Sequence, residues 1–337
     1  MAHLTNPLAT PDQIYRRSTF SALPTDLQDL IFFSTQCLTQ AAGLLLQLPQ
    51  SVTAQANVLL ARFWLVEPLL SHEFSTLSAA TLYLVAKLGP SPASARNIAN
   101  VYTYLLSEHS TLFRGAAKPP ENDVDDQGAH ATPSEMEYQA FHTRLLALEA
   151  RILHALGFDT HVALPHPLAI TYLQALDFFG AAAAAADEVR RKGLGGLAVR
   201  YLNTALLSPQ QLYVTHQPAA LAVAAVYNAA RDVGAKMPEC AWWEVFDVDR
   251  EELGFVVVGM RSVEAWVRKV REERLCGGLV EGMIDRERIE KEMERRGLRM
   301  GNGHGKGTEA VDEEEMMARL MDERIAERES EAVGMEQ

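Results

Sequence analysis

The sequence predicts an all-α protein made of two similar helical bundles in tandem. The first indication is a repeat: SHEFSTLSAATLYLVAKLG, which starts at Ser71, aligns without a gap with THQPAALAVAAVYNAARDVG, which starts at Thr215. His72 of the first copy corresponds to His216 of the second, a constant offset of 144 positions (216 − 72 = 144). The second indication is that the body of the chain, up to residue 270, lacks both the alternating apolar pattern of strands and the turn dipeptides of hairpins.

The repeated segments predict one buried helix in each half of the chain. Residues 77–88 and 219–230 are apolar almost all the way round a helical wheel and are rich in alanine. A helix without a polar face must be enclosed by other helices, and alanine lets those neighbours approach closely. We therefore expect two five-helix bundles, each built around its own central helix.

The remaining helices follow from apolar periodicity between proline and glycine breaks. The predicted segments lie at about 25–48, 51–65, 74–89, 94–107, 135–156, 165–178, 194–207, 216–231 and 238–270. The stretch GAAKPPENDVDDQGAHATPSE, from Gly115, has almost no apolar content and predicts a solvated loop. The stretch GAAAAAADEVRRKGLGG, from Gly180, predicts a helix extension followed by a mobile turn.

These segments divide the chain into four predicted parts. An N-terminal extension covers 1–24, and the first bundle covers 25–160 with a flexible insert at 114–134. The second bundle covers 161–270. The remainder, 271–337, is an acidic Glu/Arg-rich tail that we expect to be partly helical and partly disordered, since its charges recur at helical spacing around a glycine run.

Composition narrows the class of protein. The chain has 337 residues, 48% of them hydrophobic, which is enough for two ordinary cores. Its net charge of −13 disfavours direct nucleic-acid binding, because phosphate contact is driven by basic patches. The sequence contains neither a signal-peptide core nor an apolar run long enough to cross a membrane. Its three cysteines are far apart (Cys37, Cys240 and Cys276), as in a cytosolic or nuclear protein.

One carboxylate stands out on the predicted helix 135–156. On a helical wheel Glu149 projects between apolar neighbours such as Leu145 and Ile152 rather than opposite them. Burying an unpaired carboxylate costs several kcal/mol, so Glu149 should have a cation as its partner. Lys87 is the candidate, at the C-terminal end of the first central helix, where the helix dipole also favours an ammonium group.

Several stretches resemble cyclins, and the cyclin L group in particular. AAGLLLQLPQSVTAQANVLLARFW, from Ala41, looks like the entry into the first cyclin box of that group. ALEARILHALGFDTHVALPHPLAITYLQAL, from Ala147, resembles the last helix of box one, its Leu-Gly-Phe turn and the His-Pro entry into box two. QPAALAVAAVYNAARD, from Gln217, resembles the second box, so that the similarity spans about 25–270. The resemblance implies tandem cyclin boxes.

The resemblance also implies a function and a site. In cyclins the Lys and Glu at the positions of Lys87 and Glu149 form a pair that contacts a kinase beside its mobile αC helix. The chain would then be the non-catalytic regulatory subunit of a cyclin-dependent Ser/Thr kinase in RNA polymerase II transcription or pre-mRNA processing. It would be nuclear and need no cofactor, membrane or small-molecule substrate. The apolar residues that would line the contact, each of which could instead be simple core, are Leu84, Leu88, Leu148 and Ile152.

The sequence departs from the cyclin L pattern in two places and from the cell-cycle cyclins in a third. The first central helix ends AKLGPSPAS, where the family has acidic residues after its lysine. The tail is acidic rather than rich in Arg and Ser, and SVTAQANVLLARFW stands where cell-cycle cyclins carry a substrate-docking patch. The first departure leaves open a cyclin-fold scaffold that binds a kinase or a transcription complex without activating it.

Two other classes of protein fit less well. A transcription factor B-like core would use the same tandem fold, but it would need a basic surface and usually a zinc ribbon of paired cysteines. An all-helical enzyme would need a recognisable set of catalytic residues. The ten histidines do not have the spacing of metal ligands, and the sequence contains no Gly-x-Ser-x-Gly nucleophile elbow. We therefore expect neither a metal site nor catalytic residues.

Overall fold

The structure is a computed structural model, and it describes residues 4–19, 21, 23–90, 92–107, 110, 132–178, 185–272 and 284–298. Those residues form α-helices and short 3₁₀ helices and no strand. The α-helices are α1 (Pro11–Thr19), α2 (Thr25–Leu45), α3 (Gln50–Val66), α4 (Phe74–Leu88), α5 (Ala95–Leu106), α6 (Glu135–Ala155), α7 (Pro165–Ala175), α8 (Ala185–Leu206), α9 (Leu212–Thr215), α10 (Pro218–Val233), α11 (Arg250–Glu272) and α12 (Arg286–Arg295). The 3₁₀ helices are η1 (Leu69–Ser71) and η2 (Trp242–Phe246).

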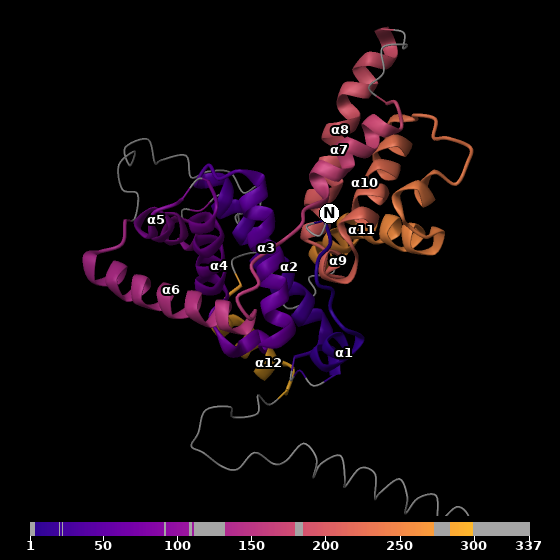
Figure 1. The fold of residues 1–337 in the computed structure, drawn as a ribbon. Helices are drawn as coiled ribbons and strands as arrows, with labels where there is room; N and C mark the ends of the chain where they lie inside the picture. The colour runs from indigo at the N-terminus through magenta and orange to yellow at the C-terminus, as the bar shows by residue number, and fades with distance from the viewer. Residues whose placement is uncertain are drawn as a thin grey trace, which may run out of the picture. The chain divides into compact units, whose positions relative to one another are not determined.

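The two predicted central helices are α4 and α10, and both are buried. Helices α2, α3, α5 and α6 pack around α4, whereas α7, α8 and α11 pack around α10 (Figure 1). Ala80 of α4 and Ala224 of α10, which correspond in the repeat, are both fully buried. The prediction of an all-α fold made of two bundles in tandem, each around a buried axis, is therefore confirmed.

The helices of the second bundle follow in the same order as those of the first, but one of them is shorter. A short turn precedes each central helix, η1 before α4 and α9 before α10. Where the first bundle has the twelve-residue α5, the second has η2, a 3₁₀ helix of five residues anchored by the buried Trp242. Asp247 then turns the backbone with φ 58°, so the single segment expected at 238–270 is divided into η2 and α11.

The glycine-rich stretch before residue 197 is helical. Gly193 and Gly196 lie inside α8, so the mobile turn expected there is wrong. Leu194 and Ala198 are fully buried, and α8 packs on α10. The local cost of glycine in a helix is up to about 1 kcal/mol per residue, and burial of one face of α8 outweighs it.

The N-terminal segment is attached to the second bundle. Asn6 exchanges two hydrogen bonds with the backbone of Ala163, at 2.9 and 2.8 Å, and two with Gln217, at 3.0 Å each. The backbone N–H of Ala9 donates to Val214 at 2.7 Å. The described part of the predicted extension 1–24 therefore packs against the body at Asn6 and Ala9, and the domain boundaries themselves stay a prediction.

Other predictions fall partly or wholly outside the described residues. The insert 114–134 is described only from 132 onwards, and the tail only at 271–272 and 284–298. The described part of the tail contains α12, in agreement with a partly helical tail. Among the helices that the structure describes, none is both long enough and apolar enough to span a bilayer.

Candidate functional site

The C-terminal end of α4 places Lys87 at the surface. The helix ends at Leu88 because Gly89 and Pro90 follow, and the Gly89 N–H closes the last turn on Val85 O at 3.0 Å. Gly89 also lies close to α3: a Cβ added there would be 3.5 Å from Val52 Cγ2. The helix thus ends one residue after Lys87, whose side chain is 49% exposed.

Helix α6 brings Glu149 to that end of α4. The helix starts at a capping box in which Ser134 and Glu137 bond to each other's backbone N–H, as the pattern S-x-x-E favours. Leu145 and Ile152 are fully buried on the same helix, which fixes the rotation of α6 against the core. Glu149 lies between them, and its side chain is only 7% exposed.

Lys87 and Glu149 form an ion pair. The Lys87 ammonium contacts Glu149 Oε1 and lies 5.4 Å from the centroid of the Tyr83 ring. The hydrogen bond to Glu149 raises the pKa of Lys87 above its ordinary value. The pairing predicted from burial of the carboxylate is therefore present, with its cationic side facing solvent. The role of this pair in contacting a partner protein stays a prediction.

The apolar residues predicted to line the contact divide into two groups. Leu88 is 60% exposed beside Lys87, and Leu148 is at the edge of burial with 9% exposed. Leu84 and Ile152 are 1% and 0% exposed, because they point into the bundle from α4 and α6. We correct the prediction for these two: they are core residues that hold the pair in place and offer no surface to a partner.

A second ion pair on α6 was missed by sequence reasoning. Arg151 Nη2 and Nε lie 2.5 and 3.0 Å from Glu67 Oε1, directly after α3. The two residues are 84 positions apart and have no local signature. Glu149 and Arg151 are two positions apart on α6, so the helix makes one ion pair to α4 and another to the end of α3. Val66, 56% exposed next to Glu67, adds an apolar group to this side of the bundle.

The repeated histidines pack against aromatic rings. The His72 ring lies 6.0 Å from Phe63, and the His216 ring is stacked on Phe255 at 5.4 Å. Burial lowers the pKa of both histidines. Each belongs to a different bundle, and their aromatic partners lie on different helices, Phe63 on α3 and Phe255 on α11. No group of three or more His, Cys, Asp or Glu in the described part of the chain could hold a metal ion.

Comparisons with known proteins identify relatives among the cyclins. The chain is 32% identical over 216 residues to a cyclin-L1-like protein of Schizosaccharomyces pombe, an alignment that covers 64% of this chain and 74% of that protein. It is 28% identical over 269 residues to human cyclin-L2, covering 79% of this chain and 46% of that protein. It spans 37% of the length of mouse cyclin-L2, at 30% identity. No family model matches the chain.

Solved structures share the fold. A chain of the yeast RNA polymerase II CTD kinase complex CTDK-1 superposes with a TM-score of 0.57, covering 94% of this chain and 89% of that one at 14% identity. A chain of the Chaetomium thermophilum CAK complex gives a TM-score of 0.55, covering 90% and 95% at 14% identity. At that level of identity the likeness concerns the fold alone. The duplicated bundles agree with the fold of these structures, and the sequence relatives show that the chain belongs to the cyclin family, in its cyclin L group.

Proposed function

We propose that this chain is the regulatory subunit of a cyclin-dependent Ser/Thr kinase that acts in RNA polymerase II transcription or pre-mRNA processing in the nucleus. The observation that carries the proposal is the Lys87–Glu149 pair, half-exposed at the end of the buried axis of the first bundle. Cyclin-L relatives support it, as do two similar solved chains that come from complexes described as a CTD kinase and as CAK. Lys87, Leu88 and Glu149 would form the centre of the kinase contact, with Leu148 at its edge.

The proposed mechanism needs no chemistry from the chain itself. A protein kinase is active when the Glu of its αC helix pairs with the strand Lys that holds the ATP phosphates. A rigid surface that binds the αC-in state better than the αC-out state shifts the kinase population by the ratio of the two affinities. Burial of Leu84 and Ile152 beneath the pair supports this role, since a surface on a packed core resists deformation.

The test compares two ion pairs of the same bundle. Lys87→Ala removes the proposed contact, and Arg96→Ala removes the cation of an exposed pair with Glu135, 2.8 Å away. The tagged full chain is purified from native cells, and the proteins bound to it are identified by mass spectrometry. We expect a cyclin-dependent kinase with the wild type and with Arg96→Ala, and about tenfold less of it with Lys87→Ala, as for loss of one charged hydrogen bond.

Thermal unfolding of each variant alone separates binding from folding. If Lys87→Ala loses kinase only in proportion to its loss of folded protein, the pair merely ties α4 to α6 and the proposed contact is wrong. Adding the purified chain to the captured kinase then distinguishes activation from scaffolding. The scaffold alternative is favoured by Leu88 and Gly89, which stand where the family carries acidic residues. It predicts a kinase that co-purifies but whose turnover does not change.

A further inference from the structure

Helix α12 presents one face to the body of the protein. Ile289, Glu292, Met293 and Arg296 recur at the i, i+3, i+4, i+7 spacing of a single helix face. Ile289 and Met293 are fully buried, and Glu292 is 6% exposed. A helix of ten residues is too short to be stable alone in water, so α12 owes its order to this contact.

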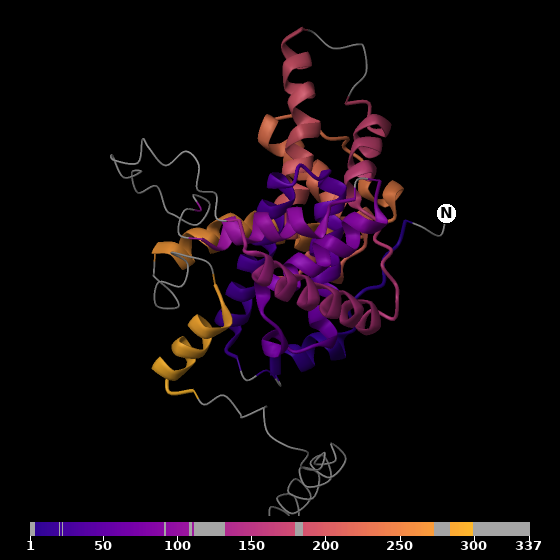
Figure 2. The same cartoon turned by 90° about the vertical axis from the view of Figure 1, so that its left-hand side faces the viewer.

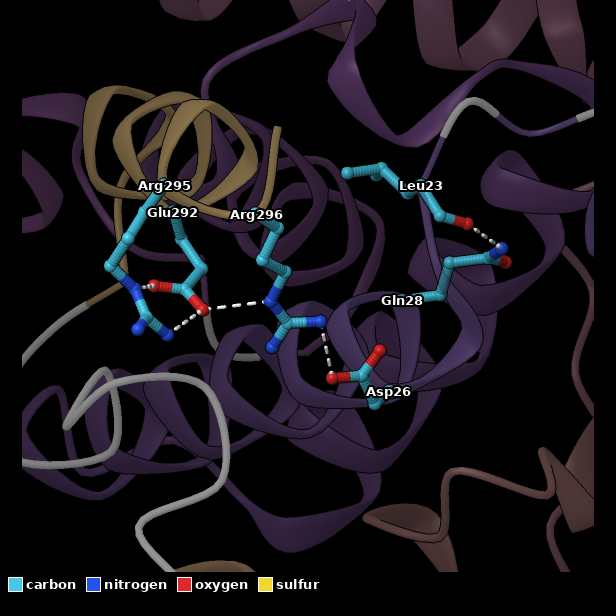
Figure 3. A network of polar contacts seen from close by, with 6 residues as sticks. All are labelled: Leu23, Asp26, Gln28, Glu292, Arg295 and Arg296. Carbon is cyan, nitrogen blue, oxygen red and sulfur yellow. Dashed lines mark hydrogen bonds and ion pairs between the residues drawn. The ribbon is translucent and has the colours of Figure 1, made fainter. Parts of the chain in front are cut away.

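A charged relay fastens this face to the first bundle (Figure 3). Glu292 accepts hydrogen bonds from Arg295 and Arg296 at 2.6–2.8 Å. Arg296 Nη1 continues to Asp26 Oδ2 on α2, at 2.8 Å and 270 positions away in sequence. The two guanidinium groups, that of Arg295 first, hold the pKa of Glu292 at about 2, so the carboxylate is ionised at any physiological pH.

The beginning of α12 contacts the beginning of α4. Burial raises the pKa of Glu73, the residue before α4, and the backbone and side chain of Arg286, at the start of α12, act against that rise. Two views of the structure place α12 beside the helices of the first bundle (Figures 1 and 2). Asp26 and Glu73 therefore mark the two ends of a docking site for α12, and both ends are acidic.

The same position is occupied in the second bundle by a different segment. Glu73 corresponds to Gln217 in the repeat (217 − 73 = 144), and each directly precedes its central helix. Gln217 is the residue that receives Asn6 from the N-terminal segment. In both bundles, therefore, a segment from outside the bundle binds at the start of the central helix, which indicates a docking site inherent in the repeat.

We propose that the edge of the first bundle at Asp26 and Glu73 is a peptide-docking site and that α12 is its displaceable intramolecular occupant. The site would take a helix with apolar residues at i and i+4 and an arginine at i+7, the pattern of Ile289, Met293 and Arg296. The ion pair between Arg296 and Asp26 joins α12 to the bundle, and such a contact weakens with salt and with charge reversal. The site goes beyond the proposed kinase contact, because Lys87 lies 14 positions after Glu73 (87 − 73 = 14), about 21 Å along the helix axis.

A peptide with the sequence of residues 284–298 tests the proposal without any kinase. In the full chain, Met293→Asp places a charge on the buried face of α12 and should vacate the site. We expect a fluorescent 284–298 peptide to bind this variant about tenfold more tightly than wild type, in which the intramolecular helix competes. Adding Asp26→Lys to the variant should abolish most of that gain. Equal binding to wild type and variant, no binding to either, or binding that ignores Asp26→Lys would each overturn the proposal.

Hydrogen exchange provides a second test, which does not require α12 to leave its docking site. Arg296→Ala removes the contact to Asp26 from a partly exposed side chain, whereas Lys291→Ala removes a solvent-exposed pair with Glu287 on the same helix. Amides of α12 should exchange about tenfold faster in Arg296→Ala than in wild type, with Lys291→Ala close to wild type. The same exchange rate in both variants would show that the relay does not hold the helix.

Discussion

Gly43 lies where α2 closely approaches α3 at Thr53, and its replacement by alanine tests how the first bundle packs. A Cβ added at Gly43 would lie 2.8 Å from Thr53 Cγ2 and 3.1 Å from Thr53 Cβ, and closer still to Thr53 Oγ1. Thr53 is 1% exposed, so its side chain has no free space to enter. As a β-branched residue in a helix, it also has few alternative rotamers.

The expected cost is the balance of two effects. Alanine gains up to about 1 kcal/mol over glycine inside a helix. Forcing an extra methyl group into a packed core costs about 1–3 kcal/mol, and the contacts at Gly43 fall at the severe end because three atoms of Thr53 are crowded. We expect Gly43→Ala to lower the free energy of unfolding by about 1–2 kcal/mol net, which for a body of this size lowers the melting temperature by about 2–8 °C.

A double-mutant cycle measures whether the crowding at Thr53 is the cause. Thr53→Ala alone should destabilise by about 1 kcal/mol or more, since it leaves a small cavity. In the double variant the new methyl group of Ala at position 43 fills that space, so the two costs should not add and the coupling should exceed about 1 kcal/mol. Urea unfolding of the four proteins gives the cycle. A neutral or stabilising Gly43→Ala, or additive costs, would refute the close approach of α2 and α3.

Three further predictions concern titration, a buried amide and the candidate site. Burial raises the pKa of Asp29 from 3.8 to about 6. The stability contributed by the protonated carboxyl is therefore present below about pH 4 and lost as the pH rises towards 6. In parallel thermal melts, Asp29→Asn should be more stable than wild type by about 1 kcal/mol at pH 7.5 and not at pH 4. Asn228 is fully buried, and its side-chain oxygen accepts a hydrogen bond from Arg261 Nε at 2.8 Å. Asn228→Ala should cost about 2 kcal/mol in urea unfolding, because Arg261 Nε loses its acceptor, and a loss below about 0.5 kcal/mol would contradict this. Lys87→Ala leaves the nearly buried Glu149 carboxylate without its cation. It should lower the free energy of unfolding by about 1–2 kcal/mol, between the values for exposed and buried ion pairs. A melting temperature equal to that of wild type would show that water solvates Glu149 instead.

The parts of the fold that could be predicted from sequence are those in which burial constrains every position. Segments 77–88 and 219–230 have no polar face, so a central place in a bundle was the only arrangement that satisfied them. The ion pair at Glu149 followed from the same reasoning, since a carboxylate among apolar neighbours requires a cation. Its partner could be chosen because a lysine at the end of a helix is also favoured by the dipole.

The parts that could not be predicted depend on contacts distant in sequence. The docking of α12 depends on two apolar residues, Ile289 and Met293, in a segment otherwise dominated by charge, and on Asp26 some 270 positions away. Local composition there predicts a solvated helix. The prediction for α8 was wrong for a related reason. Gly193 and Gly196 predicted a turn, but packing of α8 against α10 keeps both residues helical.

The two ends of α4 have separate tasks in this arrangement, and that separation has a measurable consequence. Lys87 closes the C-terminal end with an ammonium that faces solvent, whereas Glu73 stands before the N-terminal end with a carboxylate that contacts α12. Each charge is favoured where it stands near the helix termini, cationic at the C-terminus and anionic at the N-terminus. Because about 21 Å of packed helix lies between them, substitutions at Lys87 and at Arg296 should be additive in stability. A coupling above about 0.5 kcal/mol would mean that α12 and the Lys87 end of α4 are coupled through the buried axis.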